Sequence, residues 1–312
     1  MPSPSVAVID IGSNTIKLLV ATRDPTGGLQ ALTSETIDAR ISAGISRAQP
    51  CLSEEGMTRG LAAVRELLTA AVPFSPTQTA LVATSAVRDA VNGAEFRERV
   101  RAATGHDIRI LSGDEEANLI GRGLTSDPAL APLRDFYVFD LGGGSLECLA
   151  FRARQVTQAL SLPLGCVRLT ERFVADIATP FSAEARAAVA GYTERTLRES
   201  GFRFDLASHD AVFTGGSLTT ARAIAGLAEG KPLAETAPVV TVAMLERILA
   251  QVAALPLAER RAQIAGLPAA RADVFPAALA TMIAVAGIAG VSAFHHSFHN
   301  LRYGIAEELI FV

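Results

Sequence analysis

The chain has 312 residues, and 49% of them are hydrophobic, which is enough to fill the cores of two domains of ordinary size. A formal net charge of -4 excludes the uniformly basic surface of a general nucleic-acid-binding protein. The 3 cysteines lack the spacing of a disulfide framework or a zinc site, and the N-terminus lacks the features of a signal peptide. We therefore expect a cytoplasmic protein without a membrane anchor.

The first predicted strand, Val6 to Asp10, runs into a turn of small and polar residues, and strand-like composition resumes from Thr15 to Ala21. Backbone N–H groups in such a turn can converge on an anion, and the aspartate at the strand end can hold a cation that bridges phosphate oxygens. Walker and Rossmann loops differ because they lead into a helix. The candidate residues here are Asp10 for metal and Gly12, Ser13, Asn14 and Thr15 for phosphate.

The following segment alternates between helix and strand. A helix capped by Ser53 comes first, a strand spans Thr79 to Ala83, a charged helix runs to about Ala103, and another strand spans Asp107 to Leu111. Such alternation predicts an α/β fold.

Arg88 comes shortly after the strand that ends at Ala83. A guanidinium there could bind a phosphate group through paired hydrogen bonds. The alternative is an ordinary surface ion pair with Asp89 or Glu95, and the sequence does not separate the two.

Three carboxylates, Asp114, Glu115 and Glu116, occupy the first turn of the next predicted helix. Carboxylates at a helix N-terminus each stabilise the helix dipole by up to about 1 kcal/mol, which accounts for two of them without any function. Adjacent helical residues point about 100° apart, so Glu115 and Glu116 cannot both face one ligand. The residues alone leave the choice between these two open.

A second glycine-rich turn repeats the pattern of the first. The strands Phe136 to Asp140 and Leu146 to Phe151 flank it, and Asp140 again closes the first strand. The repetition indicates two similarly built domains facing one cleft. Glu147 lies in an otherwise apolar strand, so it faces either a metal or partner, or water on an exposed strand face. The candidate phosphate-binding residues of this turn are Gly142, Gly143, Gly144 and Ser145.

A third glycine turn follows the predicted strand Ala211 to Thr214 and leads into a helix. Its candidate phosphate-binding residues are Gly215, Gly216 and Ser217. Because prolines break the helical pattern between Gly123 and Leu133, we expect a first domain over residues 1–126 and a second over 127–312.

The uncharged stretch Val274 to Phe294 is long enough to cross a membrane, but its Ala- and Gly-rich composition favours a buried helix. Just beyond it, His295 and His299 are spaced to share a helix face, with His296 beside them. Without an acidic partner or a metalloprotease motif, these histidines favour packing or hydrogen bonding over metal ligation.

Taken together, these residues resemble the exopolyphosphatase and guanosine pentaphosphate phosphohydrolase (Ppx/GppA) family, within the actin, sugar-kinase and Hsp70 fold superfamily. The resemblance covers nearly the whole chain. The motifs that carry it are Asp10 to Thr15, Ala83 to Arg88, Ser112 to Ala117, Asp140 to Glu147, Ser161 to Thr170, Thr214 to Ser217, Arg271 to Val274 and Leu301 to Gly304.

The resemblance implies two actin-like (ribonuclease H-like) domains, with residues 301–312 packing back on the first. It implies that Glu116 is the base that activates the attacking water, with Glu147 as a second catalytic residue. Asp10, Asp140 and Glu147 would hold Mg²⁺, or Mn²⁺ in its place, while Arg88 and the glycine turns would bind phosphate. The expected reaction is release of orthophosphate from the end of inorganic polyphosphate.

Some positions depart from the family pattern. Lys17 stands where an arginine is often found, and the segment from Arg40 to Gly44 lacks a Leu-Gly step. The chain resembles the short, two-domain form, which favours short polyphosphates. Guanosine pentaphosphate is the alternative substrate, a nucleotide-responsive binding protein the alternative class, and phosphoryl transfer to another acceptor a third interpretation. No membrane or nucleic-acid partner is expected, and relatives suggest a homodimer.

Overall fold

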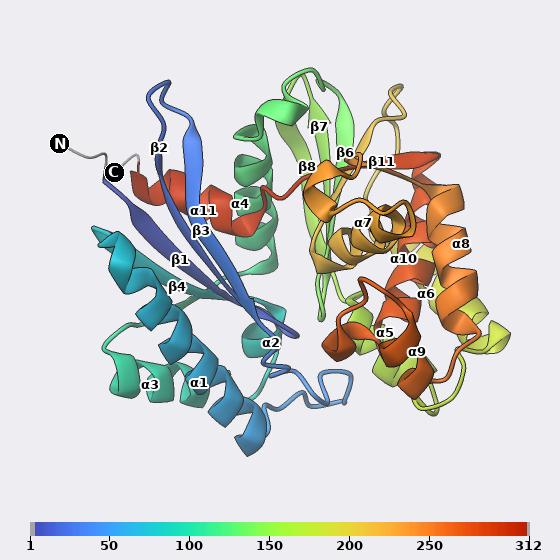
Figure 1. Cartoon of the computed structure of the whole chain (residues 1–312), viewed down its shortest axis with the longest axis horizontal. Helices are drawn as coiled ribbons and strands as arrows, with labels where there is room; N and C mark the ends of the chain where they lie inside the picture. Colours follow the sequence, from blue (N-terminus) through green and yellow to red (C-terminus); the bar gives the residue numbers. More distant parts are fainter. Residues whose placement is uncertain (1–3, 311–312) are drawn as a thin grey trace. The chain divides into compact units, whose positions relative to one another are not determined.

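The computed structural model describes residues 4–310 and divides into two compact units (Figure 1). Unit 1 comprises Met1–Pro132 and His299–Val312, and unit 2 comprises Leu133–Phe298. The expected division had its boundary after residue 126, so unit 1 extends through the proline-containing segment that follows. The features of the N-terminal residues 1–3 that bear on a signal peptide, and the packing of residues 311–312, lie outside the described residues.

Unit 1 is built around a mixed sheet of order β3-β2-β1-β4-β5. The strands β1 to β3 pair antiparallel, and β4 and β5 continue the sheet parallel to β1. Two of the three inner strands, β1 and β2, are almost entirely buried, as expected for a sheet covered on both faces. The strands are β1 (Val6–Ile11), β2 (Ile16–Arg23), β3 (Leu29–Ile37), β4 (Gln78–Ala83) and β5 (Ile108–Ile110).

Helices cover both faces of this sheet, with α1 and α3 on one side and α4 and α11 on the other (Figure 1). The helices of unit 1 are α1 (Glu54–Ala71), α2 (Ser85–Arg88), α3 (Gly93–Thr104), α4 (Gly113–Thr125) and α11 (Leu301–Ile310), with short 3₁₀ turns at Val72–Phe74 and Pro128–Leu130.

Two glycines let α4 and α11 cross at very short range. A Cβ atom on Gly304 would lie 1.9 Å from the carbonyl oxygen of Leu119, and one on Gly123 would lie 2.2 Å from that of Asn300. The C-terminal helix therefore packs on unit 1 against α4, the helix that carries Glu116.

Unit 2 repeats the strand arrangement around its own central strand β6. Its sheet has the order β10-β11-β9-β6-β7-β8, in which β6, β7 and β8 pair antiparallel and β9 and β11 continue parallel to β6. The order β8-β7-β6-β9-β11 thus matches β3-β2-β1-β4-β5 of unit 1. The strands are β6 (Phe136–Leu141), β7 (Leu146–Arg152), β8 (Gln155–Leu162), β9 (Ala211–Thr214), β10 (Val239–Thr241) and β11 (Ala293–His296).

The buried helix α10 is the centre of the helical layer of unit 2 and packs against α5, α6, α7 and α8. These helices are α5 (Cys166–Phe173), α6 (Ala183–Glu199), α7 (Gly216–Ala228), α8 (Val242–Ala253), α9 (Leu257–Gln263) and α10 (Phe275–Ala289), with 3₁₀ turns at Leu233–Glu235 and Ala269–Arg271.

The uncharged stretch from Val274 to Phe294 forms more than one element. Its helix ends at Gly290, which adopts a left-handed conformation with φ 67°, and Phe294 already lies in β11. The expectation of a buried helix is correct for α10 and wrong for the last residues. Within residues 4–310, no helix is long and apolar enough to cross a membrane.

Candidate functional site

The first glycine turn is closed by a hydrogen bond from the N–H of Gly12 to the carbonyl oxygen of Thr15, at 3.1 Å. The carbonyl oxygens of Ser13 and Asn14 accept the N–H groups of Ser42 and Arg40, at 3.3 and 2.9 Å. The N–H groups of Ser13 and Asn14 have no backbone acceptor within residues 4–310. Because the carbonyl oxygens of the turn already accept hydrogen bonds and these N–H groups have no backbone acceptor, the turn can bind an anion.

Asn14 adds a side-chain donor to this turn. Its Oδ1 accepts a hydrogen bond from Nε of Arg40 at 3.2 Å, while its buried Nδ2 has no hydrogen-bond partner in the described part of the chain. Buried donors are normally satisfied, so a phosphate oxygen would suit this amide. Arg40 itself has a φ of 45°, which is strained for a residue with a side chain and marks a constrained segment.

Asp10 ends β1 and lies directly opposite Lys17 of β2. Its buried Oδ1 has no hydrogen-bond partner among the described residues. Burial raises the pKa of the Asp10 carboxyl, while the charges of Lys17 and Arg302 act in the opposite direction. A buried carboxylate oxygen that lacks a donor fits a bound cation.

The second glycine turn has the same closure, with the N–H of Gly142 bonded to the carbonyl oxygen of Ser145 at 3.0 Å. The carbonyl oxygens of this turn accept hydrogen bonds from the first residues of helix α5. The N–H groups of Cys166 and Val167 donate to Gly142 and Gly143 at 3.0 and 2.9 Å.

Two further contacts bind α5 to this turn. Nε of Arg168 donates to the carbonyl oxygen of Gly144 at 3.0 Å. A Cβ atom on Gly165 would lie 2.3 Å from the backbone of Gly143 and Gly144, so only glycine fits there. Within residues 4–310, the N–H groups of Gly143 and Gly144 have no backbone acceptor. The second turn is therefore also an anion-binding turn.

Asp140 and Glu147 lie directly opposite each other on β6 and β7, so both side chains project from the same face of the sheet. Glu147 is only 2% exposed, and its Oε1 accepts a hydrogen bond from Oγ of Ser161 at 2.8 Å. The alternative of a solvated Glu147 on an exposed face is thereby wrong. Two neighbouring carboxylates supply the oxygen ligands that Mg²⁺ prefers.

The third glycine turn lies against Asp140. Gly215 has a φ of 97°, and a Cβ atom there would lie 2.7 Å from Oδ1 of Asp140. The following Gly216 begins α7, and a Cβ atom there would lie 2.3 Å from the Arg271 guanidinium. Gly215 therefore needs to be glycine, whereas a side chain at Gly216 would require the Arg271 guanidinium to move. The N-terminus of α7 lies beside this cation and suits an anion. Ser217, the next residue, is buried.

Glu115 and Glu116 have different environments in α4. Glu115 completes a capping box with Ser112: its carboxylate accepts the Ser112 N–H at 2.8 Å, and the Ser112 hydroxyl accepts the Glu115 N–H at 3.2 Å. Glu116 is 5% exposed and forms an ion pair with Nη1 of Arg88 at 2.7 Å. The geometry thus gives Glu115 a structural task and leaves Glu116 beside a phosphate-binding candidate.

Arg88 is held by several groups at once. Besides Glu116, it donates to the carbonyl oxygen of Leu111 at 3.1 Å and lies 3.4 Å from Oδ1 of Asp89. The ion pair with Asp89, one of the two pairs in the alternative interpretation of Arg88, is present, and Glu95 pairs with Arg99. Ser85, in the same short helix α2 as Arg88, lies 3.3 Å from Ser13 through their hydroxyl oxygens, which links α2 to the first glycine turn.

Unit 1 thus brings together Asp10, the first turn, Arg88 and Glu116, and unit 2 brings together Asp140, Glu147 and the other two turns. No group of three or more His, Cys, Asp or Glu side chains within residues 4–310 could hold a metal by itself. The fit for a cation rests on Oδ1 of Asp10 and on the Asp140–Glu147 pair.

The sequence interpretation assigned no role to Arg40 or Arg271. Arg40 was noted only for the segment that follows it, and Arg271 only as part of a motif. Their positions against Asn14 and Gly216 depend on tertiary contacts. The unusual φ of Arg40 leaves no mark in the sequence.

The three histidines do not form a group. His295 and His296 lie in strand β11, so the proposed shared helix face of His295 and His299 is wrong. His299 accepts or donates a hydrogen bond with Ser126 at 2.8 Å and stacks on Tyr303, and burial lowers its pKa.

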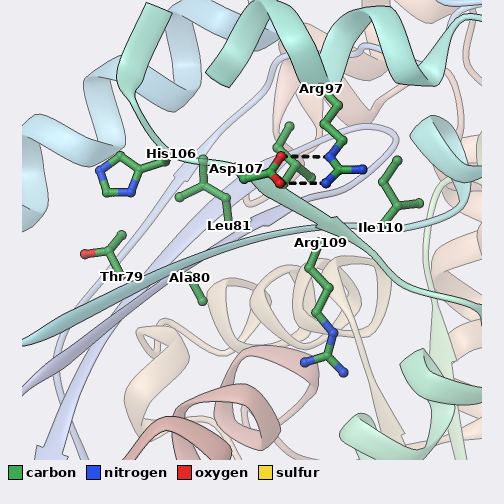
Figure 2. Close-up of a pocket in the computed structure, with 9 residues that line it drawn as sticks. Thr79, Ala80, Leu81, Arg97, His106, Asp107, Arg109 and Ile110 are labelled. Carbon is green, nitrogen blue, oxygen red and sulfur yellow. Dashed lines mark hydrogen bonds and ion pairs between the residues drawn. The ribbon is translucent and has the colours of Figure 1, made fainter. Parts of the chain in front are cut away.

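A separate open hollow of about 510 Å³ lies over β4 and β5 of unit 1 (Figure 2). Arg97 and Asp107 form a bidentate ion pair there, in which Nε lies 2.7 Å from Oδ1 and Nη2 lies 2.6 Å from Oδ2. None of the candidate site residues lines it; the lining residues are Thr79, Ala80, Leu81, Arg97, His106, Asp107, Ile108, Arg109 and Ile110.

The family model of the Ppx/GppA phosphatase family matches residues 19–310. The chain therefore belongs to the Ppx/GppA phosphatase family, and its α/β fold is the actin-like fold of solved members of that family.

Solved structures with the same fold cover nearly the whole chain. The PPX-GPPA enzyme of Aquifex aeolicus has a TM-score of 0.78 and 24% identity, with 100% of both chains covered. An exopolyphosphatase from Cytophaga hutchinsonii has a TM-score of 0.85 and 22% identity, with 98% of both chains covered. An exopolyphosphatase-like protein has a TM-score of 0.86 and 23% identity, covering 99% of this chain and 98% of its own.

Proposed function

We propose that this protein is a Mg²⁺-dependent exopolyphosphatase that removes terminal orthophosphate from inorganic polyphosphate, with short chains as its substrates. The observation that carries the proposal is the pair of glycine turns whose carbonyl oxygens are occupied while the N–H groups of Ser13, Asn14, Gly143 and Gly144 have no backbone acceptor within residues 4–310. Such turns suit an anion with several oxygens. Membership of a phosphatase family supports a phosphoric anhydride as the substrate.

In this proposal each candidate residue has one task. Glu116 accepts a proton from the attacking water, while Arg88 and the turns bind phosphoryl oxygens. Asp10 in unit 1, and Asp140 with Glu147 in unit 2, would hold Mg²⁺, which would stabilise charge on the phosphoryl oxygens. The water oxygen forms a bond to the terminal phosphorus, the bridging P–O bond breaks, and its electron pair stays with the shortened chain.

Guanosine pentaphosphate is the second candidate substrate, because its terminal phosphoanhydride has the same chemistry and the family includes phosphatases of both kinds by name. A non-catalytic, nucleotide-responsive binding protein is the alternative of another class. We place the protein in the cytosol, where three free cysteines stay reduced, and take a homodimer as the expected assembly.

The test is orthophosphate release, with and without Mg²⁺, from short polyphosphate, long polyphosphate and guanosine pentaphosphate. Glu116→Gln should lower kcat by about 10²- to 10⁴-fold, because a general base is lost. Glu115→Gln is the matched control: glutamine also forms a capping box, so activity should stay within about twofold. Substrate binding without release from any of the three would contradict the hydrolase and favour the binding protein.

A further inference from the structure

A buried cluster of unit 2 connects His296 to the third glycine turn. His296 on β11 is 6% exposed, and both of its ring nitrogens have a protein partner. Nδ1 lies 3.1 Å from Nη1 of Arg222, and Nε2 lies 3.0 Å from the hydroxyl oxygen of Thr219. A histidine held at both nitrogens in the interior has a fixed orientation.

Arg222 is itself immobilised by backbone carbonyls. Its Nε donates to Ala237 at 3.0 Å, and its Nη2 donates to Leu233 at 3.1 Å and also to Thr236. The side chain is only 6% exposed. The guanidinium therefore presents Nη1 to His296 from a fixed position, with Phe298 lying over both groups.

The direction of each hydrogen bond follows from the chemistry of the donors. A guanidinium can only donate, so Nδ1 of His296 must accept and carry no proton. The imidazole is then neutral, and Nε2 carries its proton and donates to Thr219. The Thr219 hydroxyl passes its own hydrogen on to the carbonyl oxygen of Gly215, at 3.0 Å. The chain of hydrogen bonds runs from Arg222 through His296 and Thr219 to the carbonyl oxygen of Gly215, which accepts the last one.

The last residue of this chain is the one that contacts Asp140. Gly215 has no Cβ, and its Cα lies so close to Asp140 that an added Cβ would be 2.7 Å from Oδ1. Asp140 and the neighbouring Thr214 are also paired across β6 and β9. The position of Gly215 therefore limits where the Asp140 carboxylate can lie.

We propose that His296 is a positioning residue, which as the neutral Nε2–H tautomer holds the third glycine turn through Thr219 and so fixes the Asp140 carboxylate for its ligand. The part of this proposal that concerns the ligand rests on the proposed function. The part that concerns the tautomer and the turn does not.

The tautomer is tested by long-range ¹H–¹⁵N NMR of the ¹⁵N-labelled full chain, with the His296 signals assigned by their loss in His296→Gln. We expect a proton on Nε2 and none on Nδ1. A proton on Nδ1, or on both nitrogens, at neutral pH would overturn the proposal.

The positioning role is tested with Thr219→Val, which keeps the side-chain shape and removes the hydroxyl, against Thr219→Ser, which keeps the hydroxyl. Loss of a supporting hydrogen bond behind a metal ligand typically costs about 10- to 100-fold, so Thr219→Val should weaken Mn²⁺ binding and lower kcat by about tenfold with little change in KM. Thr219→Ser should restore both to within about twofold.

His295→Gln is the matched control on β11, because adjacent strand residues point to opposite faces, and it should behave as wild type. Wild-type behaviour of Thr219→Val, or an equal loss in His295→Gln, would overturn the positioning role. An inactive wild type would count against the proposed function alone, since the tautomer and the Mn²⁺ affinity are measured without turnover.

Discussion

The two units contain the same strand–turn–strand device with opposite charges beside it. In unit 1, Asp10 faces Lys17 across β1 and β2, whereas in unit 2, Asp140 faces Glu147 at the equivalent position of β6 and β7. The backbone hydrogen bonds that close the two turns are nearly identical, at 3.1 and 3.0 Å. The residue opposite the aspartate, Lys17 on β2 or Glu147 on β7, therefore determines whether the turn lies beside two opposite charges or beside two carboxylates.

This difference suggests a division of tasks between the units. A lysine beside the first turn partly compensates Asp10 and adds attraction for phosphate. Two carboxylates beside the second turn repel each other unless a cation is bound. We accordingly expect the second turn to depend on metal more strongly than the first.

Among the variants that compare the two turns, the largest effect is expected from Glu147→Gln, which removes one of the two carboxylates beside the second turn. Loss of a metal ligand removes several kcal/mol of charge stabilisation, so kcat for orthophosphate release should fall about 10²- to 10³-fold. The corresponding variant of the first turn, Lys17→Met, should mainly raise KM, because it removes a positive charge that attracts phosphate. Steady-state kinetics at saturating Mg²⁺ distinguish the two, and equal losses of kcat in both variants would contradict the division of tasks.

The next effect concerns stability. Gly215→Ala combines a left-handed φ of 97° with a Cβ placed 2.7 Å from Asp140 and 2.9 Å from the backbone of Leu141. We expect unit 2 to lose about 2–4 kcal/mol of unfolding free energy. Hydrogen exchange resolves the loss by unit, and a change confined to unit 1 would refute the explanation.

A smaller contrast compares the first glycine of each turn. A Cβ on Gly12 would lie 3.0 Å from the Thr15 carbonyl oxygen, whereas one on Gly142 would lie 3.5 Å from that of Ser145, an ordinary contact. Gly12→Ala should therefore cost about 1 kcal/mol, and Gly142→Ala should be close to neutral. Chemical denaturation of the two variants measures their free energies of unfolding. A larger loss of stability in Gly142→Ala than in Gly12→Ala would contradict the prediction.

The smallest effect is expected in the hydrogen exchange of the backbone amides that donate to the carbonyl oxygens of the two turns. The carbonyls of the first turn are held by Arg40 and Ser42, in a segment without helix or strand, and those of the second by Cys166 and Val167 at the start of α5. The amides of the first pair should exchange with solvent about threefold faster than those of the second. NMR hydrogen exchange measures this directly, and slower exchange at Arg40 and Ser42 would show that the segment is as rigid as the helix.

The sequence predicts well what depends on local chemistry. The glycine turns, their flanking strands and the acidic start of α4 follow from neighbouring residues, and so does the repeated arrangement of the two units. The burial of Glu147 was one of two alternatives, because a carboxylate in an apolar strand needs either water or a partner.

Other features depend on contacts between distant segments and left no local signal. The choice between Glu115 and Glu116 needed the contact of Glu116 with Arg88. The end of α10 at Gly290, by contrast, has a local signal that the sequence interpretation did not use. The partners of His296 come from α7, far from it in the sequence, so the preferred role in hydrogen bonding is correct, whereas the helix face expected for His295 and His299 is wrong.

The most direct test of the division of tasks is Mn²⁺ binding, followed by electron paramagnetic resonance, in wild type, Glu147→Gln and Lys17→Met. Glu147→Gln should bind Mn²⁺ at least about tenfold more weakly, since it lacks one carboxylate ligand. Lys17→Met should bind Mn²⁺ at least as tightly as wild type, because removal of a nearby positive charge cannot repel the ion. Unchanged binding in Glu147→Gln, or weaker binding in Lys17→Met, would contradict the stronger dependence of the second turn on metal.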